Sequence, residues 1–131
     1  MQESTVTGTI LLVRPMKLPC KREVTLENQE FADIIDGNLE IVKLKKRKVA
    51  FILDYDREVL RLPLNRDVFT KDLEEKHEIY GPFIVVGLDD DLNYTGLTEQ
   101  QLRYFKNLFY TPAKKVVRNG KLMTTYRLMG R

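Results

Sequence analysis

A continuous run of six apolar or small residues, from Phe83 to Leu88 (FIVVGL), constrains the fold of this chain more than any other segment. Pro82 precedes the run and Asp89 follows it, so both of its ends carry residues that favour turns. An uninterrupted apolar run of this length is typical of a strand in the middle of a sheet. We therefore expect residues 83–88 to form a central, buried strand.

The rest of the chain alternates between predicted strands and predicted helices. Alternating or β-branched patterns predict strands over residues 6–13, 23–26, 39–44, 49–53 and 58–62. Apolar residues at helical spacing predict helices over residues 26–36, ended by a left-handed Gly37, and 98–110, where Thr98 and Gln101 match a capping box. We expect residues 63–69 to be irregular and residues 70–77 to form a short helix. The fold class predicted is α+β, with one face of a mostly antiparallel sheet of about five or six strands packed against the two longer helices.

The last part of the chain differs from the rest in its charge. The chain has 131 residues, 43% of them hydrophobic, which suits one core, and we expect residues 1–110 to form a single domain extended by residues 111–131. The extension contains no acidic residue and six basic ones, namely Lys114, Lys115, Arg118, Lys121, Arg127 and Arg131. Because the net charge is +3, residues 1–110 carry a charge of −3. Asn119-Gly120 predicts a hairpin with a type I′ turn in the extension.

The residue types that most enzymes use are scarce. The chain has a single serine, histidine and cysteine: Ser4, His77, expected at a helix end, and Cys20, expected to be half-buried and inert. Two such ligands are too few for a structural zinc site, and no glycine-rich phosphate loop is present, so no metal or other cofactor is expected. The sequence lacks a membrane-spanning run and a signal-peptide pattern, which predicts a cytoplasmic protein without a membrane partner.

Two charged segments are candidate partner-binding sites. Lys114, Lys115, Arg118, Lys121 and Arg127 form the first. They would attract an acidic protein surface more readily than nucleic acid, because aromatic residues do not interleave with them as stacking platforms do. Alternatively, the hairpin packs on the domain through Val116, Leu122 and Tyr126. The second segment is Asp89-Asp90-Asp91, which lacks the register of a calcium loop and is either a solvated loop or a mimic of phosphates that contacts a basic partner.

Other segments have two interpretations each. The basic turn around Lys45, Lys46 and Arg47 is either a phosphate-attracting patch or a solvated hairpin tip. Asn65 and Arg66 either grip an anionic ligand, or Asn65 caps a turn and Arg66 bonds backbone carbonyls. Paired carboxylates such as Asp54 and Asp56 serve acid–base catalysis in enzymes, but aspartates are also the usual turn formers. Two tyrosines of the last helix, Tyr104 and Tyr110, are candidates for a partner or dimer contact.

An ordered set of segments resembles a known family. These segments are Ile10–Val13, Ala32–Glu40, Leu62–Arg66, Gly81–Gly87 and Leu97–Gln101, the last leading to Phe105 and Phe109. Over roughly residues 8–110 the chain resembles a domain-of-unknown-function family of small proteins from phages, plasmids and other mobile elements, mainly of Gram-positive bacteria. The resemblance implies a mobile-element origin and no established enzymology.

Three functions are consistent with these features. The first is a non-enzymatic inhibitor that binds a host-defence protein stoichiometrically, in the manner of an anti-CRISPR protein or another nuclease inhibitor. The second is a sponge that sequesters a signalling nucleotide, using Arg66 and the basic turn at an interface of a homo-oligomer. The third is a hydrolase with carboxylate or metal chemistry, which ranks last because no catalytic constellation is assembled in the sequence.

Overall fold

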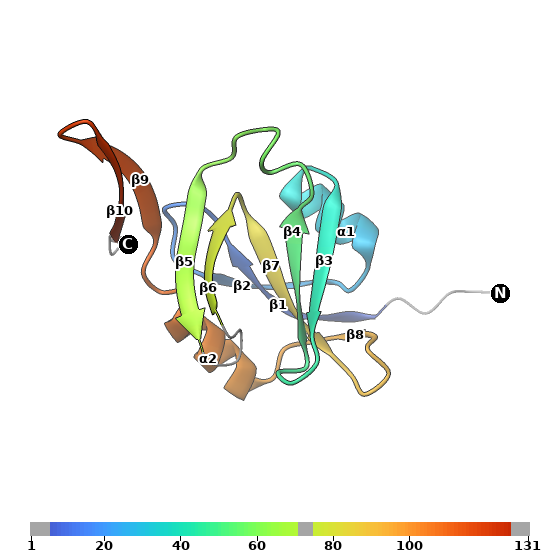
Figure 1. Ribbon diagram of the computed structural model, residues 1–131. Coiled ribbons are helices and arrows are strands. Elements are labelled where there is room, and N and C mark those ends of the chain that lie inside the picture. The colour runs from blue at the N-terminus through green and yellow to red at the C-terminus, as the bar shows by residue number, and fades with distance from the viewer. Residues whose placement is uncertain (1–5, 71–74, 127–131) are drawn as a thin grey trace.

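The computed structural model describes residues 6–70 and 75–126, and its main feature is a six-stranded antiparallel sheet. Its strands are β1 (Thr7–Val13), β2 (Cys20–Thr25), β3 (Leu39–Leu44), β4 (Val49–Asp54), β7 (Phe83–Leu88) and β8 (Tyr94–Thr95). Five of them follow the order β2-β1-β7-β4-β3, and β8 pairs with the end of β7 (Figure 1). All six residues of β7 are buried at the centre of the sheet, so both the central strand and the α+β fold class are confirmed.

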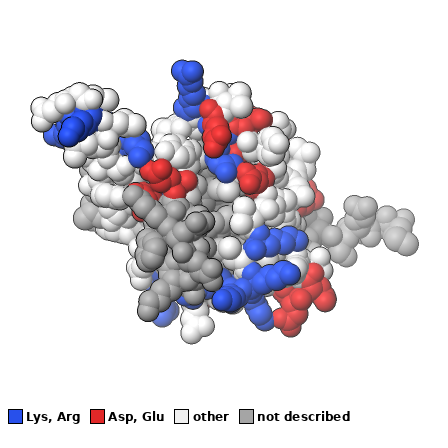
Figure 2. All heavy atoms as spheres, viewed as in Figure 1, with Lys and Arg blue, Asp and Glu red and all other residues white. Residues whose placement is uncertain are grey.

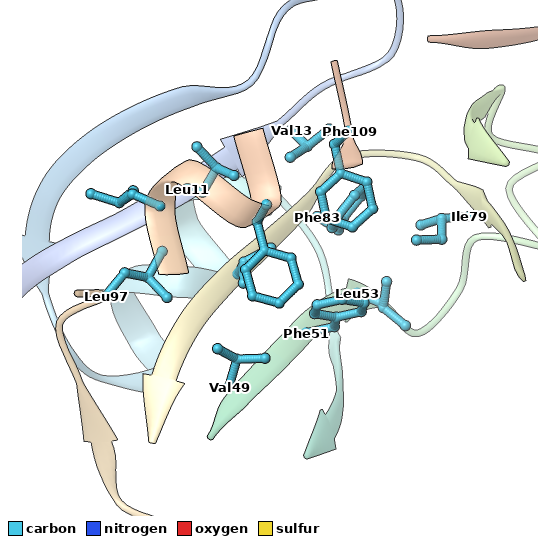
Figure 3. Packing of buried hydrophobic residues seen from close by; sticks show 12 residues of the cluster. Leu11, Val13, Val49, Phe51, Leu53, Ile79, Phe83, Leu97 and Phe109 are labelled. Atoms are coloured by element: carbon cyan, nitrogen blue, oxygen red, sulfur yellow. The ribbon is translucent and has the colours of Figure 1, made fainter. Parts of the chain in front are cut away.

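Each helix covers a different face of this sheet. Helix α2 (Glu99–Leu108) places Leu102 and Phe105 in a cluster with alternate residues of the central strands, such as Phe83 and Val85. Figure 3 shows part of this cluster, with Phe83 next to Phe109. Helix α1 (Asn28–Ile35) covers the intervening residues, such as Ile84, on the opposite face. The expectation that both helices pack on one face is therefore wrong. A strand that is apolar at every position has an apolar side chain on each face, so each face needs a cover.

A second hairpin shares the α2 face of the sheet. It consists of β5 (Leu64–Thr70) and β6 (Glu75–Tyr80), and Ile79 of β6 joins the core cluster beneath it (Figure 3). The predictions of an irregular segment over residues 63–69 and of a helix over residues 70–77 are therefore wrong, and residues 71–74 lie outside the described residues. His77 accordingly lies in a strand and not at a helix end. Antiparallel pairing between these two segments, with Ile79 packed in the core, overrides the weak helix propensity of the charged residues.

The predicted strand over residues 58–62 is instead a series of turns. The amide of Leu60 donates to the carbonyl of Asp56 (2.8 Å), and Arg61 has a positive φ of 53°. Val59 is 84% exposed, so the apolar alternation of this segment does not line a core. The turns connect β4, which lies between β7 and β3 in the main sheet, to β5 (Leu64–Thr70), which belongs to a separate two-stranded sheet.

Three smaller expectations also change. Helix α1 ends with Asp36, not Gly37, in the left-handed conformation (φ 60°), and the Asp36 amide donates to the Ala32 carbonyl. Gly37 is needed for another reason, because a Cβ at this position would lie 2.7 Å from an oxygen of the Asp54 carboxylate. The second strand is longer than predicted and begins at Cys20, which is exposed and not half-buried.

The C-terminal hairpin forms a separate two-stranded sheet. Its strands are β9 (Ala113–Arg118) and β10 (Lys121–Tyr126), and we call this hairpin the arm. Asn119 and Gly120 both have positive φ (52° and 75°), as the type I′ turn requires, so the predicted hairpin is confirmed. Figure 1 shows the arm projecting from the body beside β5. Neither described helix is long and apolar enough to cross a bilayer.

Candidate functional site

The arm has an inner face that is held to the body at its base. The hydroxyl of Tyr126 donates to the Asp67 carboxylate (2.6 Å), and the ammonium group of Lys115 lies 2.7 Å from the Glu78 carboxylate. Lys115 also donates to the hydroxyl of Thr124 (2.9 Å). The hydrogen bond to the Glu78 carboxylate raises the pKa of Lys115, as a favourable pairing should. One of the five predicted arm cations is therefore used within the chain.

The outer face of the arm carries the other described cations. The register pairs Lys114 with Thr125, Val116 with Met123 and Arg118 with Lys121, so these six side chains share one face. Lys114, Arg118 and Lys121 are exposed, and within the described part of the chain no carboxylate forms an ion pair with them. Arg127, the fifth predicted cation, lies outside the described residues.

The tip of the arm exposes apolar side chains. Val117 and Leu122 face each other across the hairpin and are 70% and 69% exposed, and Met123 on the outer face is 47% exposed. The expected packing of the hairpin through Val116, Leu122 and Tyr126 is thus limited to its base, where Tyr126 contacts Asp67. Figure 2 shows basic side chains at the outer end of the arm standing clear of the body. An apolar and cationic surface that projects in this way is suited to contact another molecule.

The base of the arm rests on a buried polar network. The Arg66 side chain is fully buried; its Nε donates to the Phe109 carbonyl (2.6 Å) and one terminal nitrogen donates to the Asn65 carbonyl and side-chain oxygen (3.0 and 2.7 Å). The other terminal nitrogen donates to the Lys17 carbonyl. Burial lowers the pKa of Arg66 to about 10. The interpretation that Arg66 bonds backbone carbonyls is confirmed.

Asn65 is a structural residue of the same network. It lies in β5, fully buried, and its amide donates to the carbonyls of Val13 (2.9 Å) and Gly81 (2.7 Å). It therefore bridges two other segments and does not cap a turn of its own. A ligand at the surface has no access to the polar atoms of Asn65 or Arg66, so the structure does not place these two residues beside the basic turn as a binding site.

The basic turn between β3 and β4 and the acidic loop after β7 lie next to each other. Lys48 and Asp90 form an exposed ion pair of 2.6 Å, which lowers the pKa of Asp90 and raises that of Lys48. The Asp89 carboxylate accepts hydrogen bonds from the amides of Asp91 and Asn93 (both 2.9 Å) and so shapes the loop. Asp89 and Asp90 thus both have intramolecular roles, which their sequence does not reveal.

A groove separates the basic turn from helix α2. Its volume is about 580 Å³, and Lys46, Arg47 and Tyr104 are among its lining residues. The Arg47 guanidinium lies over the Tyr104 ring at 4.1 Å, and the Gln101 amide donates to the Arg47 carbonyl (3.1 Å). Of the predicted ligand residues, Lys46 and Arg47 are brought together here, whereas Lys45 is exposed at the tip and is not among the lining residues. The sequence did not indicate the contribution of Gln101.

The aspartates considered for catalysis lie where strand β4 ends and the following turn begins. Asp54 is almost fully buried, and its carboxylate accepts a hydrogen bond from the Asp56 amide (2.9 Å). The Asp56 carboxylate in turn accepts from the Asn38 amide (2.9 Å). These contacts match the interpretation of Asp54 as a turn former. Within the described ranges no group of three or more histidine, cysteine or acidic residues is placed to hold a metal ion.

Comparison with known proteins identifies a family and no activity. A family model described as a domain of unknown function (DUF3846) matches residues 7–110, so the match ends before the arm begins. No curated protein and no solved structure matches the chain. The expected resemblance to a domain-of-unknown-function family is thereby confirmed.

Proposed function

Because the chain belongs to the DUF3846 family, whose description assigns no activity, we propose a function from its own surface: a non-enzymatic protein that binds an acidic protein partner with its arm. In this proposal the protein is an accessory of a phage or other mobile element, as the resemblance given in the sequence analysis implies. Its partner is a host-defence protein such as a nuclease, which it inhibits stoichiometrically in the host cytoplasm.

One observation carries this proposal. The outer face of the arm combines three cations, Lys114, Arg118 and Lys121, with the exposed apolar side chain of Met123 between them. On the opposite face of the tip, Leu122 adds a second exposed apolar side chain. Cations around an apolar centre match the composition of many protein interfaces, in which apolar contacts contribute affinity and charges orient the approach of the partner. Because the base of the arm is already held to the body, the arm loses less conformational entropy when it binds a partner.

The chemistry of the arm favours a protein partner over nucleic acid. Protein surfaces that bind single-stranded nucleic acid combine cations with aromatic side chains on which the bases stack. The arm has one described aromatic residue, Tyr126, and its hydroxyl is used at the base by Asp67. The exposed apolar side chains near the tip are aliphatic or Met and not aromatic, which suits an apolar protein surface.

The test compares two variants of equal charge. In the arm variant, Lys114, Arg118 and Lys121 are replaced by glutamine; in the control, three exposed cations of the body, Lys21, Arg22 and Lys106, are replaced in the same way. Each protein is titrated against a panel of purified host-defence nucleases, and inhibition and complex mass are measured. We expect a one-to-one complex whose association slows as salt rises, and at least a tenfold loss of inhibition in the arm variant only. Equal inhibition by both variants would reject the role of the arm.

A second candidate function rests on the groove beside helix α2. Its cations, Lys46 and Arg47, and the Tyr104 ring offer the contacts that a nucleotide needs for its phosphate and its base. In this alternative the protein sequesters a signalling nucleotide without converting it. Native mass and the ultraviolet spectrum of protein purified from a bacterial host test it directly, because the chain has no tryptophan and a bound nucleotide would dominate the spectrum. An unmodified mass together with a spectrum of tyrosine alone would count against it.

A further inference from the structure

The outer edge of strand β3 carries unused backbone hydrogen-bonding groups. β3 ends the order of the main sheet, and within the ranges 6–70 and 75–126 no strand pairs with its outer side (Figure 1). The amide of Tyr55 donates to the carbonyl of Asn38 (2.8 Å), and the antiparallel register with β4 continues from this pair. Because hydrogen-bonded and non-bonded pairs alternate along such a ladder, Leu39, Ile41 and Lys43 direct their N–H and C=O groups away from the sheet.

A groove borders this edge on each face of the sheet. On the α2 face the groove is about 200 Å³ and mainly apolar. Its apolar lining residues are Val42, Leu44, Phe51, Leu53 and Ile79, and its charged ones are Glu78 and the ion-paired Glu40 and Arg57. On the α1 face the groove is about 440 Å³ and more polar. Its lining includes Ile41, Lys43, Asn28 and Tyr94. Residues of opposite parity on β3 thus line the two grooves.

We propose that the β3 edge is a strand-addition site for an extended segment of a partner protein that carries an apolar residue next to an acidic one. Successive side chains of an added strand point to opposite faces, so neighbouring residues would enter the two different grooves. The apolar residue suits the groove lined by Val42, Phe51 and Ile79. The acidic residue suits the other groove, where Lys43 supplies the only charge among the lining residues.

The two edge strands of the sheet differ in how well charged side chains protect them from pairing with another chain, and this difference supports β3 as the site. The opposite edge strand, β2, presents consecutive exposed charges at Lys21, Arg22 and Glu23, a pattern that discourages pairing with another chain. On β3, the charge that could discourage pairing with another chain is that of Lys43. Its ammonium group donates to the Leu92 carbonyl (3.1 Å) and is therefore held over the α1 face of the sheet and away from the strand edge. Val42 beside it is 37% exposed. The β3 edge is therefore the less protected of the two.

A defined peptide tests the proposal. The probe is the acetylated and amidated peptide KTVDVDVTK, in which valine and aspartate alternate, and the control peptide KTVVVDDTK has the same composition without the alternation. Binding is measured by calorimetry, and the site is mapped by hydrogen exchange of the full chain with and without peptide. We expect only the alternating peptide to bind, with new protection at the amides of Leu39, Ile41 and Lys43 and none along β2.

Two substitutions at one position separate the backbone contribution from the charge. Lys43→Thr keeps the outward N–H and removes the charge, and we expect affinity for the probe to fall about two- to fivefold. Lys43→Pro also removes the N–H, which an edge strand tolerates, and we expect a fall of about tenfold or more. Circular dichroism checks that both variants remain folded.

Several results would overturn the proposal. They are equal binding of both peptides, protection away from β3, or a dimer in which the β3 amides are already protected by a second copy. The groove on the α2 face includes Glu78, which also binds Lys115 at the base of the arm, but neither the β3 edge nor its two grooves include the outer face of the arm. The outcome at this site is therefore distinguishable from the proposed inhibition. The variant with Lys114, Arg118 and Lys121 replaced should bind the probe like the unmodified protein, and the Lys43 variants test this site without touching the arm.

Discussion

The Nε atom of Arg66 donates a hydrogen bond of 2.6 Å to the carbonyl of Phe109, the residue that ends helix α2. The last carbonyls of a helix lack partners within the helix and lie at the negative end of its dipole, so a buried cation is well placed there. The arm begins at Ala113, only a few residues later, and Ala113 is itself buried. Arg66 therefore links the core to the point from which the arm projects.

Replacing Arg66 should destabilise the whole domain. Arg66→Met leaves the buried carbonyls of Phe109 and Asn65, and the Lys17 carbonyl, without the guanidinium, and we expect the free energy of unfolding to fall by about 2–4 kcal/mol. Arg66→Lys keeps the charge but lacks the fork, so it should rescue only part of this loss. Urea unfolding measures both variants, with Arg14→Met as an exposed control. A stability equal to the control would show that the network does not support the fold.

The same network explains which strand was not predicted from the sequence. Asn65 and Arg66 resemble loop residues because both are polar and follow Pro63. They are buried in β5 because their partners come from other segments, such as the carbonyls of Val13 and Phe109. A pattern within a short window cannot reveal acceptors that are brought together only by tertiary folding.

The elements that were predicted correctly have local causes. β7 was recognisable from its continuous apolar run, and α2 from the spacing of Leu102 and Phe105 after a capping box. The hairpin turn followed from the preference of Asn119 and Gly120 for positive φ. By contrast, the groove between the basic turn and Tyr104 joins distant segments, so the candidate site was only partly predictable.

The capping box of α2 should make a moderate contribution to the free energy of unfolding. The Thr98 hydroxyl accepts from the Gln101 amide (3.1 Å), and the Gln101 side chain accepts from the Thr98 amide (2.9 Å). Thr98→Ala removes one of these bonds and should lower the free energy of unfolding by about 1 kcal/mol, whereas Thr98→Ser should be near neutral. Thermal and urea unfolding would measure the difference, with exposed Thr111→Ala as the matched control. Equal losses for the alanine and serine variants would contradict the role of the hydroxyl.

Replacing Gly37 should destabilise the protein because a side chain there would collide with Asp54, and not because the backbone of Gly37 has a positive φ. A Cβ there would lie 2.7 Å from Asp54 Oδ2, so Gly37→Ala should cost about 1–3 kcal/mol of stability. Asp54→Ala also destabilises, because the Asp56 amide loses its acceptor. If the close approach is the cause, the double variant should lose less than the sum of the two single losses, which a double-mutant cycle by urea unfolding measures. Additive losses would contradict it.

The Lys48–Asp90 ion pair should be detectable as a lowered pKa of the Asp90 carboxyl group in a pH titration. The Lys48 ammonium holds the pKa of Asp90 below its ordinary value, so the pair favours the folded state above the ordinary aspartate pKa. That contribution is lost as the pH falls through the depressed value, because protonation removes the carboxylate charge. Carbon-13 NMR of the Asp90 carboxyl should show a low pKa that rises in Lys48→Met and at high salt. An Asp90 pKa that is the same in both proteins would show that the two side chains do not pair in solution.

Substituting the turn of the arm should loosen the arm and leave the body unchanged. Gly120 has a φ of 75°, and a Cβ at this position would meet no atom within 4 Å, so the cost of Gly120→Ala comes from backbone strain, about 1 kcal/mol. Asn119→Gly is the matched control, because glycine tolerates the positive φ of that position (52°). The inner-face contacts of Tyr126 and Lys115 hold only the base of the arm, so local opening should stay local. Amide hydrogen exchange should therefore accelerate along β9 and β10 in Gly120→Ala and remain unchanged in β7. Acceleration of the same size in β7 would instead mean that the arm and the body unfold as one unit.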